Sequence, residues 1–67
     1  MKLRDLYEVI PLHTMVQLEH NEDGRVLLYE DQGSAKVLPY LDWNLINLHV
    51  RDQLGNLIAV INPPDES

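Results

Sequence analysis

Two short chain reversals with one shared pattern constrain this fold more than any other feature. The segments "NEDG" (21–24) and "DQLG" (52–55) begin with Asn or Asp and end with glycine. This pattern suits a type I turn closed by a glycine in the left-handed conformation, which makes a three-residue hairpin loop. Apolar residues alternate with other residues on both sides of each reversal, as they do in strands. Residues 14–30 and 45–62 are therefore predicted to form two β-hairpins.

Each predicted turn also fixes a pairing register. If the first residue of the turn lies opposite the residue after the glycine, Leu18 faces Leu28 in the first hairpin. The same rule places Val50 against Ile58 in the second hairpin. Apolar residues of both hairpins then share one face of the sheet. With apolar residues of the helical segments, the predicted core is Leu3, Leu6, Ile10, Val16, Leu18, Val26, Leu28, Leu41, Ile46, Leu48, Val50, Ile58 and Val60.

Two short helical segments flank the first hairpin. Apolar side chains recur at positions 3, 6, 7 and 10, and Pro11 disfavours the helical conformation of the residue before it, which predicts a helix over 3–10. The segment "PYLDW" (39–43) is predicted to form a helical turn, with Pro39 in its first position and Asn44 as its cap.

These elements define a fold class. Residues 1–62 are predicted to form one small α+β domain, followed by an acidic flexible tail at 63–67. The short N-terminal helix packs on a four-stranded, mainly antiparallel sheet of two hairpins, in the order β-β-short helix-β-β. A sheet that curls into a partly closed barrel is the alternative. The pattern does not predict the strand order between the hairpins.

Composition excludes several classes of function. Eleven acidic residues oppose five basic ones, and the net charge of −6 disfavours direct binding to nucleic acid. The chain has no cysteine, which excludes disulfides, thiolate metal sites and cysteine nucleophiles and is typical of a cytoplasmic protein. No segment approaches the roughly 20 apolar residues of a membrane span, and the N-terminus lacks the apolar region of a secretory signal.

The first reversal also resembles a calcium-binding loop. In "EHNEDGRVLLYE" (19–30), acidic and amide residues and a glycine stand near the positions that an EF-hand loop requires. An EF-hand needs a helix on each side, whereas the flanking segments here alternate with the period of strands. The hairpin interpretation is therefore favoured, and no metal or other cofactor is predicted.

Other catalytic patterns are absent from the sequence. The three histidines, His13, His20 and His49, do not stand at helical spacing with an acidic residue, and we expect them on the surface. The glycines are isolated, so they form no phosphate-binding loop, and no nucleophile, base and acid arrangement is visible. We therefore expect a protein that is not an enzyme, and a small metal-dependent enzyme is the least favoured alternative.

The second face of the predicted sheet carries apolar residues that one short helix cannot cover. Exposed apolar patches of this kind usually mark interfaces. The leading prediction is therefore a non-enzymatic interaction module that associates with itself, as a dimer or higher oligomer, or with another protein. Coverage by the central helical turn and the tail is the alternative. The candidate interface residues are Met15, Leu27, Tyr29, Trp43, Leu57 and Ile61.

A second functional hypothesis rests on charge. Acidic residues gather in the sequence around the first hairpin, where a one-sided acidic surface would let the protein bind a basic partner by imitating nucleic acid. This hypothesis requires that the carboxylates share one surface after folding. The residues of this candidate acidic patch are Glu19, Glu22, Asp23, Glu30 and Asp31.

The order of several short motifs resembles a type of small protein found in phages and prophages of Gram-positive bacteria. The motifs are "LxxLYEVI", the Asp-Gly turn, "LLYE" and "G-x-AK-x-LPYL", and the resemblance extends over about residues 1–62. It implies a bacterial or phage cytoplasmic setting, in which an acidic inhibitor of a host or defence protein is a plausible role. It implies no site residue, because none of these motifs is catalytic.

Overall fold

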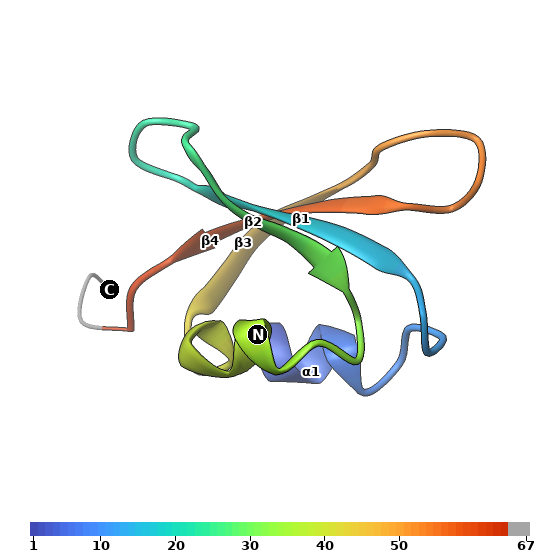
Figure 1. The fold of residues 1–67 in the computed structure, drawn as a ribbon. Helices are drawn as coiled ribbons and strands as arrows, with labels where there is room; N and C mark the ends of the chain where they lie inside the picture. The colour runs from blue at the N-terminus through green and yellow to red at the C-terminus, as the bar shows by residue number, and fades with distance from the viewer. Residues whose placement is uncertain (65–67) are drawn as a thin grey trace.

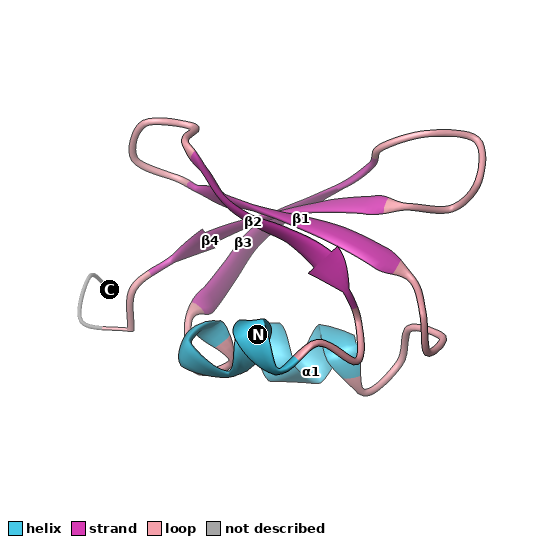
Figure 2. Cartoon of the chain, in the orientation of Figure 1, coloured by secondary structure: helices cyan, strands magenta, loops and turns pink. Residues whose placement is uncertain are grey.

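A computed structural model describes residues 1–64 and confirms the α+β class (Figure 1). Both helices lie on one side of a four-stranded sheet, and the two hairpin loops extend away from them (Figure 2). Residues 65–67 of the predicted tail lie outside the described residues. In chain order the elements are α1 (Leu3–Tyr7), β1 (Met15–His20), β2 (Val26–Asp31), the 3-10 helix η1 (Ala35–Tyr40), β3 (Asn44–Val50) and β4 (Leu57–Asn62).

The sheet is mixed, with the strand order β2-β1-β4-β3. Each hairpin is antiparallel, as predicted, and the two hairpins join through a parallel pairing of β1 with β4. These central strands carry the fully buried sheet residues Val16, Leu18, Ala59 and Ile61. β2 and β3 are the two edges, so the sheet is open and the partly closed barrel is not supported.

Both helical segments differ from their predicted bounds. α1 ends at Tyr7 instead of residue 10. The chain continues as a turn in which the Val9 and Ile10 N–H groups both donate to the Leu6 carbonyl, and Pro11 disfavours a further helical residue. The central helix spans Ala35–Tyr40 instead of 39–43, so Pro39 lies inside it. Its N-terminus is set by Ser34, whose hydroxyl oxygen accepts a hydrogen bond from the Lys36 N–H at 3.2 Å.

Both hairpin loops are one residue longer than predicted. The His20 N–H donates to the Arg25 carbonyl at 2.8 Å, which leaves residues 21–24 as a four-residue loop. In the first hairpin, a bulge at Leu27 corrects this offset, and Leu18 pairs with Leu28 as predicted. Val26 lies beyond the bulge and is 53% exposed, so its predicted place in the core is wrong.

In the second hairpin, the longer loop leaves the strand pairing shifted by one residue over most of its length. The Arg51 N–H donates to the Asn56 carbonyl at 2.7 Å, and Val50 pairs with Leu57 instead of Ile58. A one-residue shift moves a strand's side chains to the opposite face. The helix side of β4 therefore carries Leu57, Ala59 and Ile61, and the prediction that Ile58 and Val60 face the core is wrong.

The core lies between the helices and the central strands. Leu3, Leu6, Val16 and Leu18 are buried, as predicted, while Ile10, Leu28 and Leu41 pack against the core from its margin. The core residues that the sequence prediction missed are Tyr7, Val37, Ala59 and Ile61. The predicted core residues Ile46, Leu48 and Val50 are exposed.

The loop glycines supply a direct test of the hairpins. Gly24 and Gly55 have φ values of +72° and +88°, as the turn pattern requires, and an added Cβ would meet no atom within 4 Å. We expect Gly24→Ala and Gly55→Ala each to lower the free energy of unfolding by about 1 kcal/mol, through backbone strain alone. Urea titration measures this loss. Gly33→Ala is the control, because Gly33 has no positive φ and its Cβ would contact only the flexible Leu12 and Asp31 side chains, at 3.4 and 3.5 Å.

Candidate interaction surface

The free edge of β3 combines exposed apolar side chains with backbone groups that pair with no other strand within residues 1–64. Ile46, Leu48 and Val50 are 50%, 41% and 72% exposed. The Arg51 N–H points toward β4, so alternation along the strand directs the Leu48 and Val50 N–H groups away from it. The Leu48 N–H donates instead to the side-chain oxygen of its neighbour Asn47 at 2.9 Å. β3 is an edge of the described sheet, and a second strand would pair there by replacing the Asn47 side chain at the Leu48 N–H.

The open part of this edge is bounded at both ends. At its start, the Leu45 N–H donates to the Met1 carbonyl at 2.8 Å, and the Leu3 N–H donates to the Trp43 carbonyl at 2.9 Å. A one-pair bridge joins Lys2 to Asn44 in this short pairing. Ile46 is an extra residue that interrupts the register between β3 and β4. The regular open stretch is consequently 47–50, followed by Arg51.

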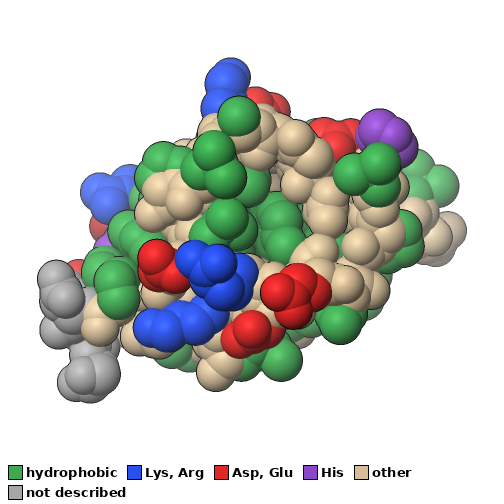
Figure 3. Space-filling view, turned by 90° about the horizontal axis from the view of Figure 1, so that it is seen from below, with side chains coloured by type: hydrophobic (Ala, Val, Ile, Leu, Met, Phe, Trp, Pro, Cys, Tyr) green, Lys and Arg blue, Asp and Glu red, His purple; other side chains and the backbone are tan. Residues whose placement is uncertain are grey.

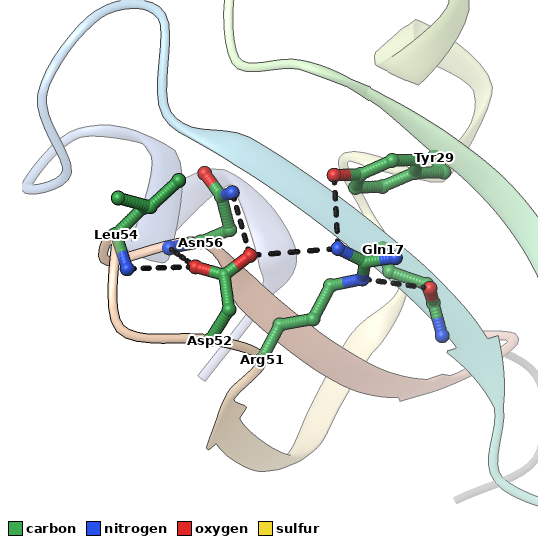
Figure 4. Close-up of polar contacts among 6 residues, drawn as sticks. All are labelled: Gln17, Tyr29, Arg51, Asp52, Leu54 and Asn56. Atoms are coloured by element: carbon green, nitrogen blue, oxygen red, sulfur yellow. Dashed lines mark hydrogen bonds and ion pairs between the residues drawn. The ribbon is translucent and has the colours of Figure 1, made fainter.

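At its other end, the edge stops at the loop 52–55, which Asp52 organises (Figure 4). One Asp52 carboxylate oxygen accepts from the Leu54 N–H at 2.9 Å, and the other accepts from the Asn56 side-chain amide, also at 2.9 Å. The Asn56 side-chain hydrogen bond, followed by those from the Leu54 and Asn56 backbone and by the Arg51 charge, lowers the pKa of Asp52 below its ordinary value. The loop is thus held closed by an ionised carboxylate at neutral pH.

The opposite edge, β2, is protected by charge. Its last residues are Glu30 and Asp31. The Glu30 carboxylate forms an ion pair with the Lys36 ammonium group of η1 at 3.3 Å, and the Asp31 carboxylate contacts the His13 ring nitrogen Nδ1 at 3.2 Å. Charged side chains on an edge strand discourage pairing with another chain. β3 (Asn44–Val50) contains no Asp, Glu, Lys, Arg or Pro, so the two edges of the sheet are unequal.

The face of the sheet away from the helices is partly covered by Arg51 (Figure 4). Its guanidinium lies 4.4 Å from the centre of the Tyr29 ring and donates to the Tyr29 hydroxyl at 3.2 Å and to the Gln17 side-chain oxygen at 3.3 Å. This side chain extends from the end of β3 across β4 and contacts residues of β1 and β2. Of the candidate interface residues, Met15 and Tyr29 lie on this face, which is less open than predicted.

The other candidate interface residues lie elsewhere. Ile61 is fully buried, so it belongs to the core instead of a surface. Leu27 packs against the core from the bulge in β2, and Leu57 faces the helix side. Trp43 also packs against the core, with its ring edge-on to His20 and Tyr40 at centroid distances of 5.6 and 5.1 Å. The structure therefore does not bring the six predicted residues together on one surface.

The candidate acidic patch is also dispersed. Glu22 and Asp23 lie in the first loop, whereas Glu30 and Asp31 lie at the far end of the same hairpin. Register places Glu30 on the helix side, opposite Val16, and Glu19 on the other face. From the helix side, acidic and basic side chains lie next to one another without a continuous acidic surface (Figure 3).

Two carboxylates of the first hairpin are also engaged in local contacts. Glu19 accepts a hydrogen bond from the Gln17 amide at 2.7 Å. The Arg25 N–H donates to the Asp23 carboxylate at 3.0 Å and lowers the pKa of that carboxyl group, with the Arg25 and His20 charges as smaller causes. The condition for charge mimicry, a shared acidic surface, is not met by these carboxylates.

One histidine departs from its predicted surface position. His20 is buried against Trp43, and its Nδ1 accepts a hydrogen bond from the Glu22 N–H at 3.2 Å. The sequence offered a signal, because His20 continues the buried alternation of Val16 and Leu18. Within residues 1–64, no three His, Asp or Glu side chains are grouped to hold a metal ion. The same residues contain no helix long and apolar enough to cross a membrane.

Comparisons with family models, curated proteins and solved structures found no match to this chain. The resemblance to small phage and prophage proteins consequently stays a prediction.

Proposed function

We propose that this protein is a non-enzymatic interaction module that associates with itself through the free edge of β3. The observation that carries this proposal is the contrast between the two sheet edges. β3 presents Leu48 and Val50 beside outward-pointing backbone groups and has no charged side chain. An edge of this kind is a template for pairing with another strand.

Charge favours a second copy at this edge over contact elsewhere on the molecule. The chain has a net charge of −6, so two copies repel each other where acidic side chains meet. Pairing through β3 brings together strands without acidic residues, whereas pairing through β2 brings Glu30 and Asp31 of each copy to the interface. The interface that we propose therefore has the smaller electrostatic cost.

The length of the edge sets the expected strength. A pairing of about five residues buries less than the roughly 1,200 Å² of a stable protein interface. We therefore expect a weak, reversible dimer, with a dissociation constant between about 10 µM and 1 mM. Sedimentation velocity over a concentration series up to about 1 mM covers this range.

Val50→Lys tests the proposal. A lysine at a central position of the pairing edge adds a charge that the second strand must desolvate, so we expect self-association to weaken by about tenfold or more. Val26→Lys is the matched control, because Val26 is an exposed apolar residue of the opposite edge strand. Equal association of both variants, or a wild-type chain that is monomeric throughout the series, contradicts the proposed function.

A further inference from the structure

We infer that the second copy pairs with β3 in one register, antiparallel about a two-fold axis at His49. This inference rests on the proposed self-association and adds the geometry of the contact. In it, His49 lies opposite the partner's His49, and Leu48 lies opposite the partner's Val50. Three observations select this register: the direction of the backbone groups, the bounds of the open edge and the face occupied by each side chain.

The direction of the backbone groups restricts the possible registers. Antiparallel strands pair residues of the same kind, either both exchanging hydrogen bonds or both not. Leu48 and Val50 direct their backbone groups to the free edge, whereas His49 directs its groups to β4. A two-fold axis at His49 pairs Leu48 of each copy with Val50 of the other, so both residues exchange hydrogen bonds across the new interface.

The bounds of the edge decide between the two central registers. A two-fold axis at Leu48 would place Ile46, the residue that interrupts the β3–β4 register, opposite the partner's Val50. It would also bring the start of the loop 52–55 closer to the partner's Met1–Leu3 segment, which already occupies the start of the edge. An axis at His49 uses the uninterrupted stretch from Asn47 to Arg51 and avoids the irregular residue.

The side chains agree with this choice. Leu48 and Val50 share the helix side of the sheet, because they pair with Ala59 and Leu57 of β4. In the two-fold register, Leu48 and Val50 of both copies form one apolar cluster on that side. These are side chains that the helices leave exposed. The pairing thus covers the apolar surface that the single chain cannot bury.

On the opposite face, the two His49 side chains meet across the axis. Directly opposite residues that do not exchange hydrogen bonds have Cα atoms about 4.5 Å apart. The strand packed beside His49, β4, contains no ionisable side chain. The same face of the sheet carries the charged side chains of Arg51 and, on β1, Glu19. Arg51 is itself paired with Asp52 at 3.5 Å. The short His49–His49 separation therefore distinguishes this register from its alternatives.

Cysteine cross-linking tests the register. The chain has no cysteine, so a single substitution gives an unambiguous product. His49→Cys is expected to form an inter-chain disulfide in glutathione buffer, because the expected Cα separation falls within the range of about 4.4–6.8 Å for disulfides. Asn47→Cys is the matched control on the same face: its two copies would be displaced by about 14 Å along the strands and should stay reduced.

The outcomes separate this inference from the proposed function. If Val50→Lys disrupts a dimer but His49→Cys cross-links only in mixtures with Asn47→Cys, the edge pairs in another register and the inference is overturned. A wild-type chain that is monomeric at all concentrations overturns both the inference and the proposed function.

Discussion

Replacing Ile61 with alanine is expected to lower the free energy of unfolding by about 3–4 kcal/mol. Ile61 is fully buried and lies between β1 and β3, paired with His20 and Leu45. Its truncation removes apolar contacts on both sides and leaves a cavity in a thin core. A domain of 67 residues has a total stability of about 3–10 kcal/mol, so this one change is expected to remove a large part of it.

Ile58→Ala is the matched control for this prediction. Ile58 lies on the same strand but on the opposite face, where it is half-buried, and we expect its truncation to cost about 1 kcal/mol. Urea unfolding followed by the fluorescence of Trp43, the single tryptophan, measures both values. A larger loss for Ile58→Ala than for Ile61→Ala would mean that β4 presents its other face to the helices.

The second large effect is expected at alkaline pH and originates at Tyr7. Burial raises the pKa of Tyr7 to about 12, from an ordinary value of 10.0. Below pH 10 the hydroxyl is protonated in both the folded and unfolded chains, so its contribution to stability is constant. Between pH 10 and 12 the unfolded chain releases this proton first, and stability falls as pH rises. We expect this group to account for a loss of about 2–3 kcal/mol over that interval.

Tyr7→Phe isolates this contribution. The Tyr7 hydroxyl is buried without a hydrogen-bond partner among residues 1–64, so its removal at pH 7 should leave stability unchanged or slightly higher. The two chains should then diverge between pH 10 and 12, with the Phe variant the more stable. Urea unfolding at a series of pH values measures this difference. Parallel stability curves over that range would show that Tyr7 titrates as an ordinary exposed tyrosine.

The hairpins show how far local patterns determine pairing. The turn pattern correctly located both reversals and the positive φ of their glycines, but it predicted loops one residue too short. In the first hairpin, a bulge at Leu27 compensates for this offset, so Leu18 and Leu28 still pair. In the second hairpin, the irregularity at Ile46 comes after most of the paired residues. It increases the shift from the predicted register instead of cancelling it. Bulges depend on packing against both neighbours, which alternation along one strand does not encode.

The register of the second hairpin explains why the candidate interface was wrong in part. The one-residue shift exchanges the two faces of β4. Leu57 and Ile61, which were expected on the surface, therefore lie on the helix side, and Ile58 and Val60 lie on the opposite face. The free edge of β3 was not predicted because it depends on strand order. If β3 were central, Leu48 and Val50 would lie beside another strand; the parallel pairing of β1 with β4 leaves them at the margin.

The amino-acid sequence by itself determined which segments are strands, where the chain reverses and that one small α+β domain results, because these depend on residue spacing and on glycines with left-handed backbone. Tertiary structure decided which face of β4 is buried, which strands form the edges and how the carboxylates are distributed. Those features arise from contacts between segments distant in the chain, where a single inserted residue changes the face that a whole strand presents.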